Sequence, residues 1–332
     1  MRNQLIRALL GPSRFADLKS FLAGARAHPR LALSMSRASA TSALRQLDPT
    51  EPRTWEFSGF SQNGEDGIVD FLCDRLQSSN RYFVEIGAAN GFENNTSWLA
   101  IARRYSGLMI DGDPSKVAEC AQVFKRLNWA LDFAAILVNR QTIADVEKRV
   151  LLRDPDVFSL DIDSIDYHVA AALLERSFRP KIFIVEYNAV FGPERAVTVP
   201  YQDEFNRHRQ HPTGFYYGAS VTAMRRLLES HGYRFVTVEQ NGFNAFFVDP
   251  AHFDSGFLDA VRGTAYRENI LHRYESRSGW REQFEQVKHL PLETCDGLDG
   301  LEGLDRFDGA PAGDEHAAAP SWPSRRAQPA VP

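Results

Sequence analysis

The stretch YFVEIGAANG at residues 82–91 decides the fold of this chain. Its apolar residues predict a buried strand, and the small residues that follow predict a turn into a helix. We expect Gly87 and Gly91 to let the backbone approach a nucleotide-like ligand where a Cβ would collide. The candidate cofactor-binding residues of this loop are Glu85, Gly87, Asn90 and Gly91.

A second apolar run, at residues 106–110, ends in the sequence Asp-Gly-Asp-Pro at 111–114. An acid at the tip of the second strand of a βαβ unit is placed to hold a ribose diol, and Asp111 follows Glu85 at about the expected spacing. Asp111 and Asp113 are therefore further candidates for cofactor binding. The alternative is that Asp113 only starts the next helix, which would still leave Asp111 free for a ligand.

Strand-like and helix-like segments alternate along the middle of the chain. After a helix at 64–76, strands are predicted at 82–86, 107–111, 129–135, 157–161 and 181–187, with helices between them at 95–104, 114–126, 142–152 and 166–176. A helix at 219–231 precedes two strands at 234–238 and 244–248, which a turn containing glycine joins. We therefore predict an α/β fold of the Rossmann-like, doubly wound kind, with a mostly parallel seven-stranded sheet and a C-terminal antiparallel hairpin.

The ends of the chain differ in composition from its middle. With 332 residues, 43% of them hydrophobic, the chain can bury one large core. The first 50 residues carry eight Lys or Arg against two Asp, a charge of +6, although the whole chain carries −5. We predict a basic helical extension at 1–50, one folded domain at 51–290 and a disordered, acidic, Gly/Ala/Pro-rich tail at 291–332. Weak contact of the extension with an anionic membrane surface is an alternative to packing on the domain.

Several classes of protein are disfavoured by the sequence. No apolar run approaches the roughly 20 residues that span a bilayer, and Arg7, Arg14 and Lys19 interrupt the apolar residues near the N-terminus, so we expect a cytoplasmic protein. The three cysteines are far apart and form no metal-type pair, which predicts reduced, structural thiols. An acidic protein also lacks the basic surface that nucleic-acid binding requires.

Acidic and amide side chains follow the fourth and fifth predicted strands. Asp161, Asp163 and Asp166 follow the fourth strand, and Glu186 and Asn188 end the fifth. Parallel neighbouring strands would bring these groups to one rim, where Asp161, Asp163 and Glu186 are the candidate catalytic residues. One interpretation is a Mg²⁺ site with Asp161, Glu186 and Asn188 as ligands, and another is a general base whose pKa the neighbouring acids raise. The remaining alternative is that these residues only cap a helix and hold turns.

A long insert at 190–217 follows the fifth strand. Its aromatic residues and histidines are Phe191, Tyr201, His208, His211, Phe215, Tyr216 and Tyr217. We interpret the insert as a lid that recognises a polar metabolite, and the alternative is a loop packed on the edge of the sheet. His168 is a further candidate base, unless it lies on the surface of its helix.

Five blocks of the sequence resemble an FkbM-type S-adenosylmethionine-dependent methyltransferase of class I. The blocks are residues 83–91, 111–114, 159–167, 185–188 and 244–248, within a resemblance that covers 58–250. The resemblance implies an O-methyltransferase that acts on a hydroxyl of a sugar, glycan or other secondary metabolite. It also implies that Glu85, Gly87 and Gly91 form the cofactor loop and that Asp111 holds the ribose. Asp111 and Gly112 stand where many members have Glu-Pro.

The chemistry of the first loop favours the same cofactor independently of the resemblance. The loop lacks the Gly-x-Gly-x-x-Gly pattern, and Glu85 would repel a pyrophosphate but suits a ligand with an ammonium and a sulfonium group. NAD is therefore disfavoured. Two other classes stay open, namely a methyltransferase-like binding or scaffold module without turnover and a glycosyltransferase that uses Asp161 and Asp163 to hold a metal.

Overall fold

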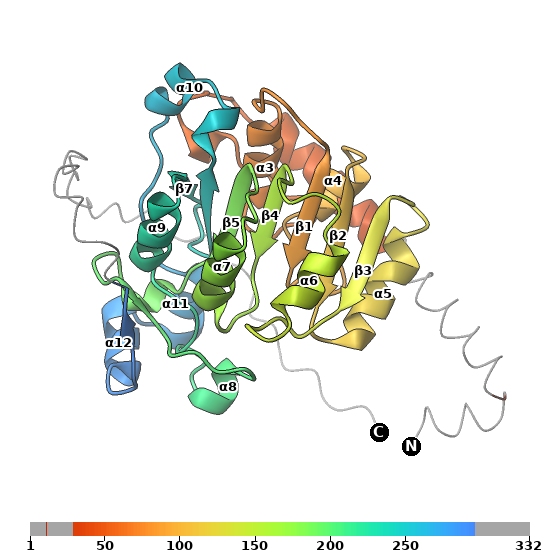
Figure 1. Cartoon of the computed structure of the whole chain (residues 1–332). Coiled ribbons are helices and arrows are strands. Elements are labelled where there is room, and N and C mark those ends of the chain that lie inside the picture. Colours follow the sequence, from red (N-terminus) through yellow and green to blue (C-terminus); the bar gives the residue numbers. More distant parts are fainter. Residues whose placement is uncertain (1–10, 12–28, 296–332) are drawn as a thin grey trace, which may run out of the picture. The chain divides into compact units, whose positions relative to one another are not determined.

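A seven-stranded sheet forms the centre of the computed structural model, which describes residue 11 and residues 29–295 (Figure 1). The order of the strands is β3 (Leu131–Ala135), β2 (Ser106–Asp111), β1 (Tyr82–Ile86), β4 (Val157–Leu160), β5 (Ile182–Glu186), β8 (Asn244–Val248) and β7 (Arg234–Val238). The first five strands of this order are parallel, whereas β8 is antiparallel to both β5 and β7. The predicted Rossmann-like sheet with its C-terminal hairpin is confirmed.

Helices cover both faces of the sheet, and the alternation of side chains along β1 explains which residues meet which layer. Val84 and Ile86 belong to one hydrophobic core and Phe83 to the other. The first core also contains residues of α6 (Ile143–Arg149), α7 (Asp166–Glu175) and α9 (Val221–Ser230), and the second contains residues of α3 (Glu65–Cys73), α4 (Ser97–Ile101) and α5 (Pro114–Phe124). Because side chains alternate across a strand, Glu85 points to the same face as Phe83. The acid of β1 is therefore directed toward the loop that leads into α4.

The insert and the region after β8, for which we predicted no helices or strands, pack against each other. The insert forms η2 (Ala189–Phe191), β6 (Val197–Thr198) and α8 (Arg207–Gln210), and the region after β8 forms η3 (Pro250–His252), α10 (Ser255–Ala260), α11 (Ile270–Ser276), α12 (Trp280–Val287) and β9 (Glu293–Thr294). β6 pairs with β9, and Phe191, Phe215 and Tyr216 are buried with Val287 in a small core of their own. These aromatic residues of the expected lid are thus core residues, and the C-terminal region is their partner.

The described ends of the chain are attached to the domain. Residues 29–43 are helical, and Leu31 and Met35 of this helix pack against the second core. A short 3-10 helix, η1 (Pro52–Thr54), follows before α3. Residues 291–295, which the sequence placed in a disordered tail, are part of the fold, because β9 is paired and Cys295 is only 6% exposed. The predictions for residues 1–10, 12–28 and 296–332, including the membrane-binding arm, lie outside the described residues.

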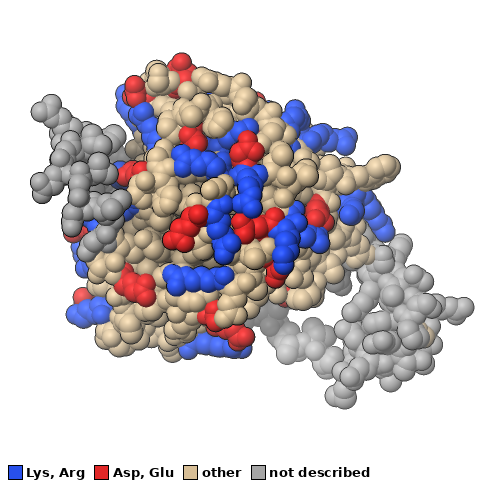
Figure 2. All heavy atoms as spheres, in the orientation of Figure 1, with Lys and Arg blue, Asp and Glu red and all other residues tan. Residues whose placement is uncertain are grey.

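The cysteines, the lengths of the helices and the surface charges of the described residues can be compared with the sequence. All three cysteines are buried and none forms a disulfide in the described part of the chain, which agrees with the predicted structural thiols. Within the described ranges no helix is both long and apolar enough to cross a bilayer. On the face drawn in Figure 2, basic and acidic side chains are interspersed. Ion pairs of the described residues include Arg149 with Asp132 and Arg153 with Glu147. Exposed pairs of this kind contribute about 0–1 kcal/mol each, so they add little to the stability of the fold.

Candidate functional site

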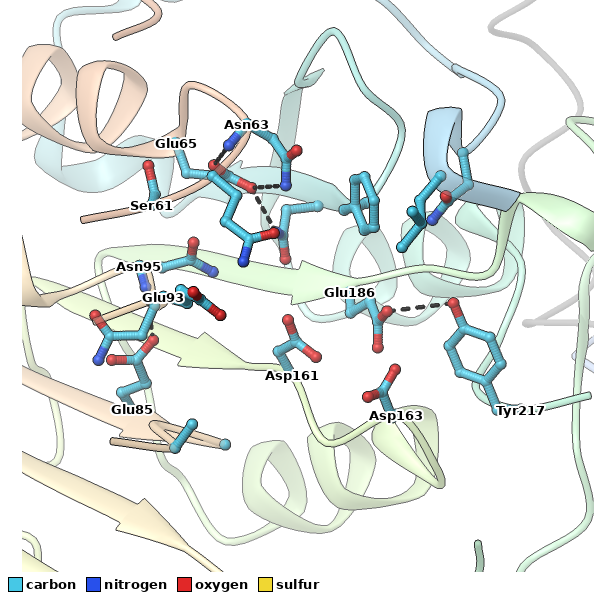
Figure 3. A pocket seen from close by; sticks show the side chains of 18 of the residues that line it. Ser61, Asn63, Glu65, Glu85, Glu93, Asn95, Asp161, Asp163, Glu186 and Tyr217 are labelled. Carbon is cyan, nitrogen blue, oxygen red and sulfur yellow. Dashed lines mark hydrogen bonds between the residues drawn. The ribbon is translucent and has the colours of Figure 1, made fainter. Parts of the chain in front are cut away.

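A cavity of about 370 Å³ lies at the carboxyl ends of β1, β4 and β5 (Figure 3). β1 and β4 are neighbours, and the chain proceeds from β1 toward one edge of the sheet and from β4 toward the other. Open α/β sheets bind ligands at this switch point, and the volume lies within the range of about 300–1,000 Å³ that is typical of ligand pockets. Glu85 and Asn95 lie at one end of the cavity and Glu186 and Tyr217 at the other, with Asp161 between them.

Glu85 is a buried acid at the first end of the cavity. Its side chain accepts hydrogen bonds from the Asn95 backbone N–H (2.8 Å) and from Thr96 Oγ1 (2.5 Å). Burial raises the pKa of Glu85 to about 7, although these hydrogen bonds act in the opposite direction. Glu85 therefore fixes the start of α4 and places a carboxyl group that titrates near neutral pH beside the cavity.

The two glycines of the loop are required by neighbouring protein atoms. Gly87 has φ +96°, and a Cβ at this position would lie 1.6 Å from the backbone oxygen of Asp161. Gly91 has φ +82°, and its Cβ would lie 2.6 Å from the ring of Phe124. Gly87 lines the cavity but Gly91 does not. The sequence analysis expected a ligand to approach these glycines, whereas the groups that approach them in the structure are Asp161 and Phe124, and contact with a ligand stays a prediction.

Asp111 and Asp113 form a turn beside the loop and do not line the cavity. Asp111 accepts hydrogen bonds from the backbone N–H groups of Ala89 (2.9 Å) and Asp113 (2.8 Å), so it is not the free acid that the sequence predicted. Asp113 caps α5 by accepting a hydrogen bond from the Ser115 N–H (2.8 Å), which confirms the helix-start interpretation. Each carboxylate oxygen has a further lone pair, and a role for Asp111 toward a ribose stays a prediction.

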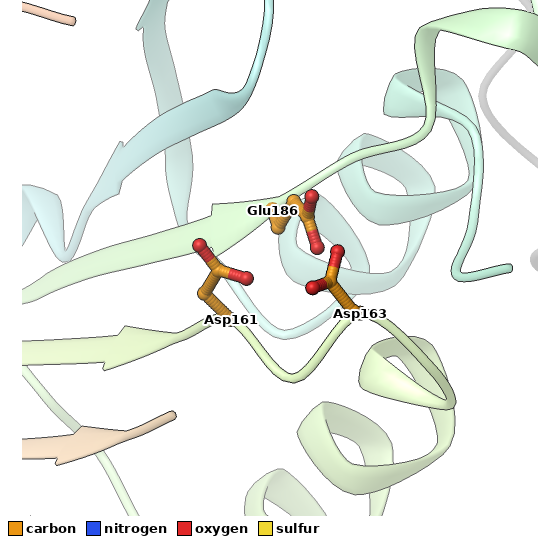
Figure 4. Close-up of side chains that lie close together, drawn as sticks. All are labelled: Asp161, Asp163 and Glu186. Carbon is orange, nitrogen blue, oxygen red and sulfur yellow. The ribbon is translucent and has the colours of Figure 1, made fainter. Parts of the chain in front are cut away.

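The three candidate catalytic acids lie close together, from the middle of the cavity to its second end (Figure 4). One carboxylate oxygen from each of Asp161, Asp163 and Glu186 lies within 4.8 Å of the others. Burial first, and then repulsion between the acids, raises the pKa of Asp161 and of Glu186 well above the ordinary range. Asp163 is more exposed and forms an ion pair with Arg207, while Tyr217 donates a hydrogen bond to Glu186 Oε1 (3.2 Å).

Two other residues from the same strand ends are structural. Asn188 is completely buried, and its amide donates hydrogen bonds to the carbonyl oxygens of Phe215 (2.8 Å) and Tyr217 (2.9 Å). Its Oδ1, the atom that would bind a metal, accepts a hydrogen bond from the Val190 N–H (3.0 Å) and caps η2. The structure therefore contradicts the predicted role as a metal ligand and places Asn188 in a turn, as the alternative predicted. Asp166 accepts hydrogen bonds from the N–H groups of Ile162 and Ser164 and so holds the turn before α7.

His168 does not line the cavity, so the structure does not place it as a base. Its Nε2 lies 2.9 Å from the backbone oxygen of Val199, and its Nδ1 lies 3.2 Å from a guanidinium nitrogen of Arg140. The side chain is 3% exposed, so the alternative of a surface position is also wrong. The insert hides this face of α7, which the sequence of the helix does not reveal.

Several residues of the cavity were not predicted from the sequence. Arg207 comes from α8 of the insert and Asn244 from the start of β8. Asn269 immediately precedes α11, and His272 lies in its first turn. Asn244 was placed in a predicted strand, and Asn269 precedes a short apolar segment, but neither pattern indicates a ligand site. Contacts between distant parts of the chain bring these residues together.

Unpartnered polar atoms are concentrated around this cavity. Nine buried side-chain N or O atoms of the described residues have no hydrogen-bond partner. Five of them belong to residues that line the cavity, namely Asn94 Nδ2, Glu186 Oε2, Asn244 Oδ1, Asn269 Nδ2 and His272 Nδ1. Because buried polar groups are nearly always hydrogen-bonded, this concentration indicates a site that binds a polar ligand.

Comparisons with known proteins concern the fold. No family model and no curated protein matches the chain. Solved structures similar to it include the CurJ carbon methyltransferase (12% identity, TM-score 0.36, 55% of this chain and 52% of that chain) and Aeropyrum pernix fibrillarin with bound S-adenosyl-L-methionine (13%, 0.34, 54% and 73%). An O-methyltransferase from Bacillus cereus in complex with SAH is also similar (16%, 0.33, 50% and 72%). The chain thus spans about half the length of the CurJ enzyme, and the function has to be argued from its own residues.

Proposed function

We propose that this protein is a cytoplasmic, FkbM-type O-methyltransferase that uses S-adenosylmethionine to methylate a hydroxyl of a sugar, glycan or other secondary metabolite. The observation that supports this proposal best is the charge of the cavity. Its lining contains six carboxyl groups, those of Glu65, Glu85, Glu93, Asp161, Asp163 and Glu186, against the cations Lys116 and Arg207. Although burial raises the pKa of Glu85, Asp161 and Glu186, the acids outnumber the cations, and their oxygen atoms favour a ligand with an ammonium and a sulfonium group over a pyrophosphate.

The first end of the cavity fits the cofactor. When bound, S-adenosylmethionine supplies a methyl group attached to a positively charged sulfonium. After the methyl group has been transferred, the sulfur remains as a neutral thioether. Glu85 and the loop around Asn90 would hold it, and Asn94 offers a buried Nδ2 donor without a partner, which suits a carboxylate or hydroxyl of the ligand. Asp111 anchors the same loop through Ala89 and is the candidate for the ribose.

The second end of the cavity suits the handling of a proton. Because burial and repulsion raise the pKa of both Asp161 and Glu186, the pair holds a proton more tightly than isolated carboxylates do. The ionised member can accept the proton of an acceptor hydroxyl, as a general base does. The same oxygen atoms are of the kind that Mg²⁺ prefers, and a bound Mg²⁺ would lower the pKa of a hydroxyl that it contacts.

Calorimetry on the whole chain tests the first part of the proposal. We expect S-adenosylmethionine and S-adenosylhomocysteine to bind and to raise the melting temperature, because a ligand that binds only the native state stabilises it. NAD is the control, and we expect it to do neither. If neither adenosyl compound gives heat or a shift in melting temperature, the cofactor assignment is wrong.

Turnover separates the proposal from its alternatives. A binding or scaffold module would bind the cofactor but methylate no acceptor. A glycosyltransferase would bind a sugar nucleotide, which carries a pyrophosphate and is disfavoured by the six acids. Binding measured with UDP-glucose in place of S-adenosylmethionine distinguishes this last class.

A further inference from the structure

The C-terminal region contributes two unpartnered side chains to the acceptor end of the cavity. Asn269 and His272 line the cavity and are 3% and 6% exposed. Asn269 Nδ2 and His272 Nδ1 have no hydrogen-bond partner. The imidazole of His272 lies 6.2 Å from the ring of Tyr217, between centroids, and Tyr217 in turn donates a hydrogen bond to Glu186. Two buried polar atoms on this one turn, both without a partner in the protein, are suited to binding a polar ligand.

We propose that Asn269 and His272 bind hydroxyl groups of the methyl acceptor, and that this acceptor is a neutral, polyhydroxylated molecule. This inference rests on the proposed function and specifies its second substrate. The pair acts in recognition and positioning, while Asp161 and Glu186 lie closer to the reacting oxygen in the proposed reaction.

The chemistry of the two side chains favours hydroxyl groups. An asparagine amide nitrogen only donates, whereas a neutral imidazole has one donor and one acceptor nitrogen. Burial first, and then the charge of Arg207, lowers the pKa of His272 to about 4, so the ring is neutral at physiological pH. A hydroxyl group both donates and accepts, so neighbouring hydroxyls satisfy such a pair, together with the unpartnered Asn244 Oδ1 and Glu186 Oε2.

The charge and the unpartnered atoms around the site disfavour other ligand classes. An anionic acceptor would need Arg207 as its partner, but the guanidinium of Arg207 is already paired with Asp163, and the acids of the lining outnumber the cations. An amine could pair with Glu186, but it would leave the Asn269 Nδ2 donor unpaired, and a buried unpaired donor costs about 1–3 kcal/mol. A neutral polyol carries no negative charge toward the acids, and its hydroxyl groups can accept the hydrogen bond of Asn269 Nδ2.

Both side chains are held in place before a ligand binds. Asn269 Oδ1 accepts a hydrogen bond from the His272 N–H (2.9 Å) and so caps α11. The Ile270 N–H donates to the carbonyl oxygen of Asn241 (2.9 Å) in the turn between β7 and β8. The ring of Phe215 lies 5.1 Å from the imidazole, between ring centroids. A fixed pair of this kind costs little conformational entropy on binding, which suits a recognition site.

The test uses methyl glycosides of glucose, mannose and rhamnose as probes. Their binding to the whole chain saturated with S-adenosylhomocysteine is measured by saturation-transfer NMR. The variant His272→Phe removes the ring nitrogens, His272→Asn retains a polar atom near the Nδ1 position, and Asn269→Ser removes the amide donor but keeps a good helix cap. The exposed His289, changed to Ala, is the matched control because it lies outside the cavity.

We expect at least one glycoside to bind, with binding weakened about tenfold or more in His272→Phe and in Asn269→Ser. We expect His272→Asn to retain most of the affinity and His289→Ala to match the unmodified chain, with S-adenosylhomocysteine binding unchanged throughout. The two His272 variants decide the matter if Asn269→Ser fails to fold.

Three outcomes would overturn this inference. These are equal glycoside binding in His272→Phe and the unmodified chain, equal losses in His272→Phe and His289→Ala, and no binding of any neutral glycoside to the S-adenosylhomocysteine complex. Failure of S-adenosylhomocysteine itself to bind would instead refute the proposed function, so the two failures are distinguishable.

Discussion

The replacement of Gly87 by alanine tests the close contact between Gly87, in the loop after β1, and the backbone oxygen of Asp161, in the loop after β4. At φ +96° an L-residue is strained, which costs about 1–2 kcal/mol. The new Cβ would also lie 1.6 Å from the Asp161 backbone oxygen, so the loops after β1 and β4 must separate. Overpacking of this kind costs about 1–3 kcal/mol more. We therefore expect Gly87→Ala to lower the free energy of unfolding by roughly 2–5 kcal/mol, a large part of the 5–15 kcal/mol typical of a domain.

Urea denaturation followed by circular dichroism measures this loss. Gly218→Ala is the matched control, because Gly218 also has a positive φ (+57°) but its Cβ would meet nothing within 4 Å. The control isolates the conformational cost, and the excess loss in Gly87→Ala reports the contact with Asp161. Because the separated loops carry Glu85 and Asp161, we also expect weaker S-adenosylhomocysteine binding in Gly87→Ala. If both variants lose the same stability, the contact with Asp161 does not hold the two loops together and the reasoning is refuted.

Four further predictions concern the acids and the C-terminal end. Asp161→Asn and Glu186→Gln should each reduce turnover of an identified acceptor by about 10²-fold or more while sparing cofactor affinity, and near-normal rates would show that these acids have no catalytic role. In the same assay, loss of activity with EDTA and recovery with Mg²⁺ would support a metal at these acids, whereas indifference to EDTA would favour direct base chemistry. Asp111→Ala should weaken S-adenosylmethionine binding by roughly 1.5–3 kcal/mol, and calorimetry that finds unchanged affinity would move the ribose-binding role elsewhere. Because the pKa of Glu85 is raised to about 7 from its ordinary 4.5, the folded state holds more protons than the unfolded state between these values, and stability falls as pH rises through that window. Glu85→Gln should remove this part of the pH dependence in thermal melts, and parallel curves for the two proteins would contradict the assignment. Removal of residues 296–332 should leave the melting temperature and cofactor binding unchanged, and a decrease of more than a few degrees would show that this acidic, Gly/Ala/Pro-rich segment stabilises the fold.

The sequence by itself determined the sheet and the position of the site along its rim. All seven strands lie within two residues of their predicted bounds, because alternating and buried apolar runs are local patterns that the sequence displays directly. The acids Asp161 and Glu186 were assigned to one site because parallel neighbouring strands end at the same edge. The sequence also singled out Gly87 as a position without room for a Cβ, although it assigned the approaching group to a ligand and the structure places the Asp161 backbone oxygen there.

Only the tertiary structure decided which polar groups reach the cavity. Asn188 and Glu186 are two residues apart, yet the carbonyl oxygens of the insert bind the Asn188 amide and leave Glu186 to face the cavity. Asn269 and His272 reach the cavity more than 80 residues after Glu186, because the C-terminal region packs on the insert and the turn of Asn241 holds the start of α11. The physical reason is that strand and helix patterns are set by neighbours along the chain. Whether a buried amide or imidazole is satisfied depends instead on the groups that packing brings to it from distant segments.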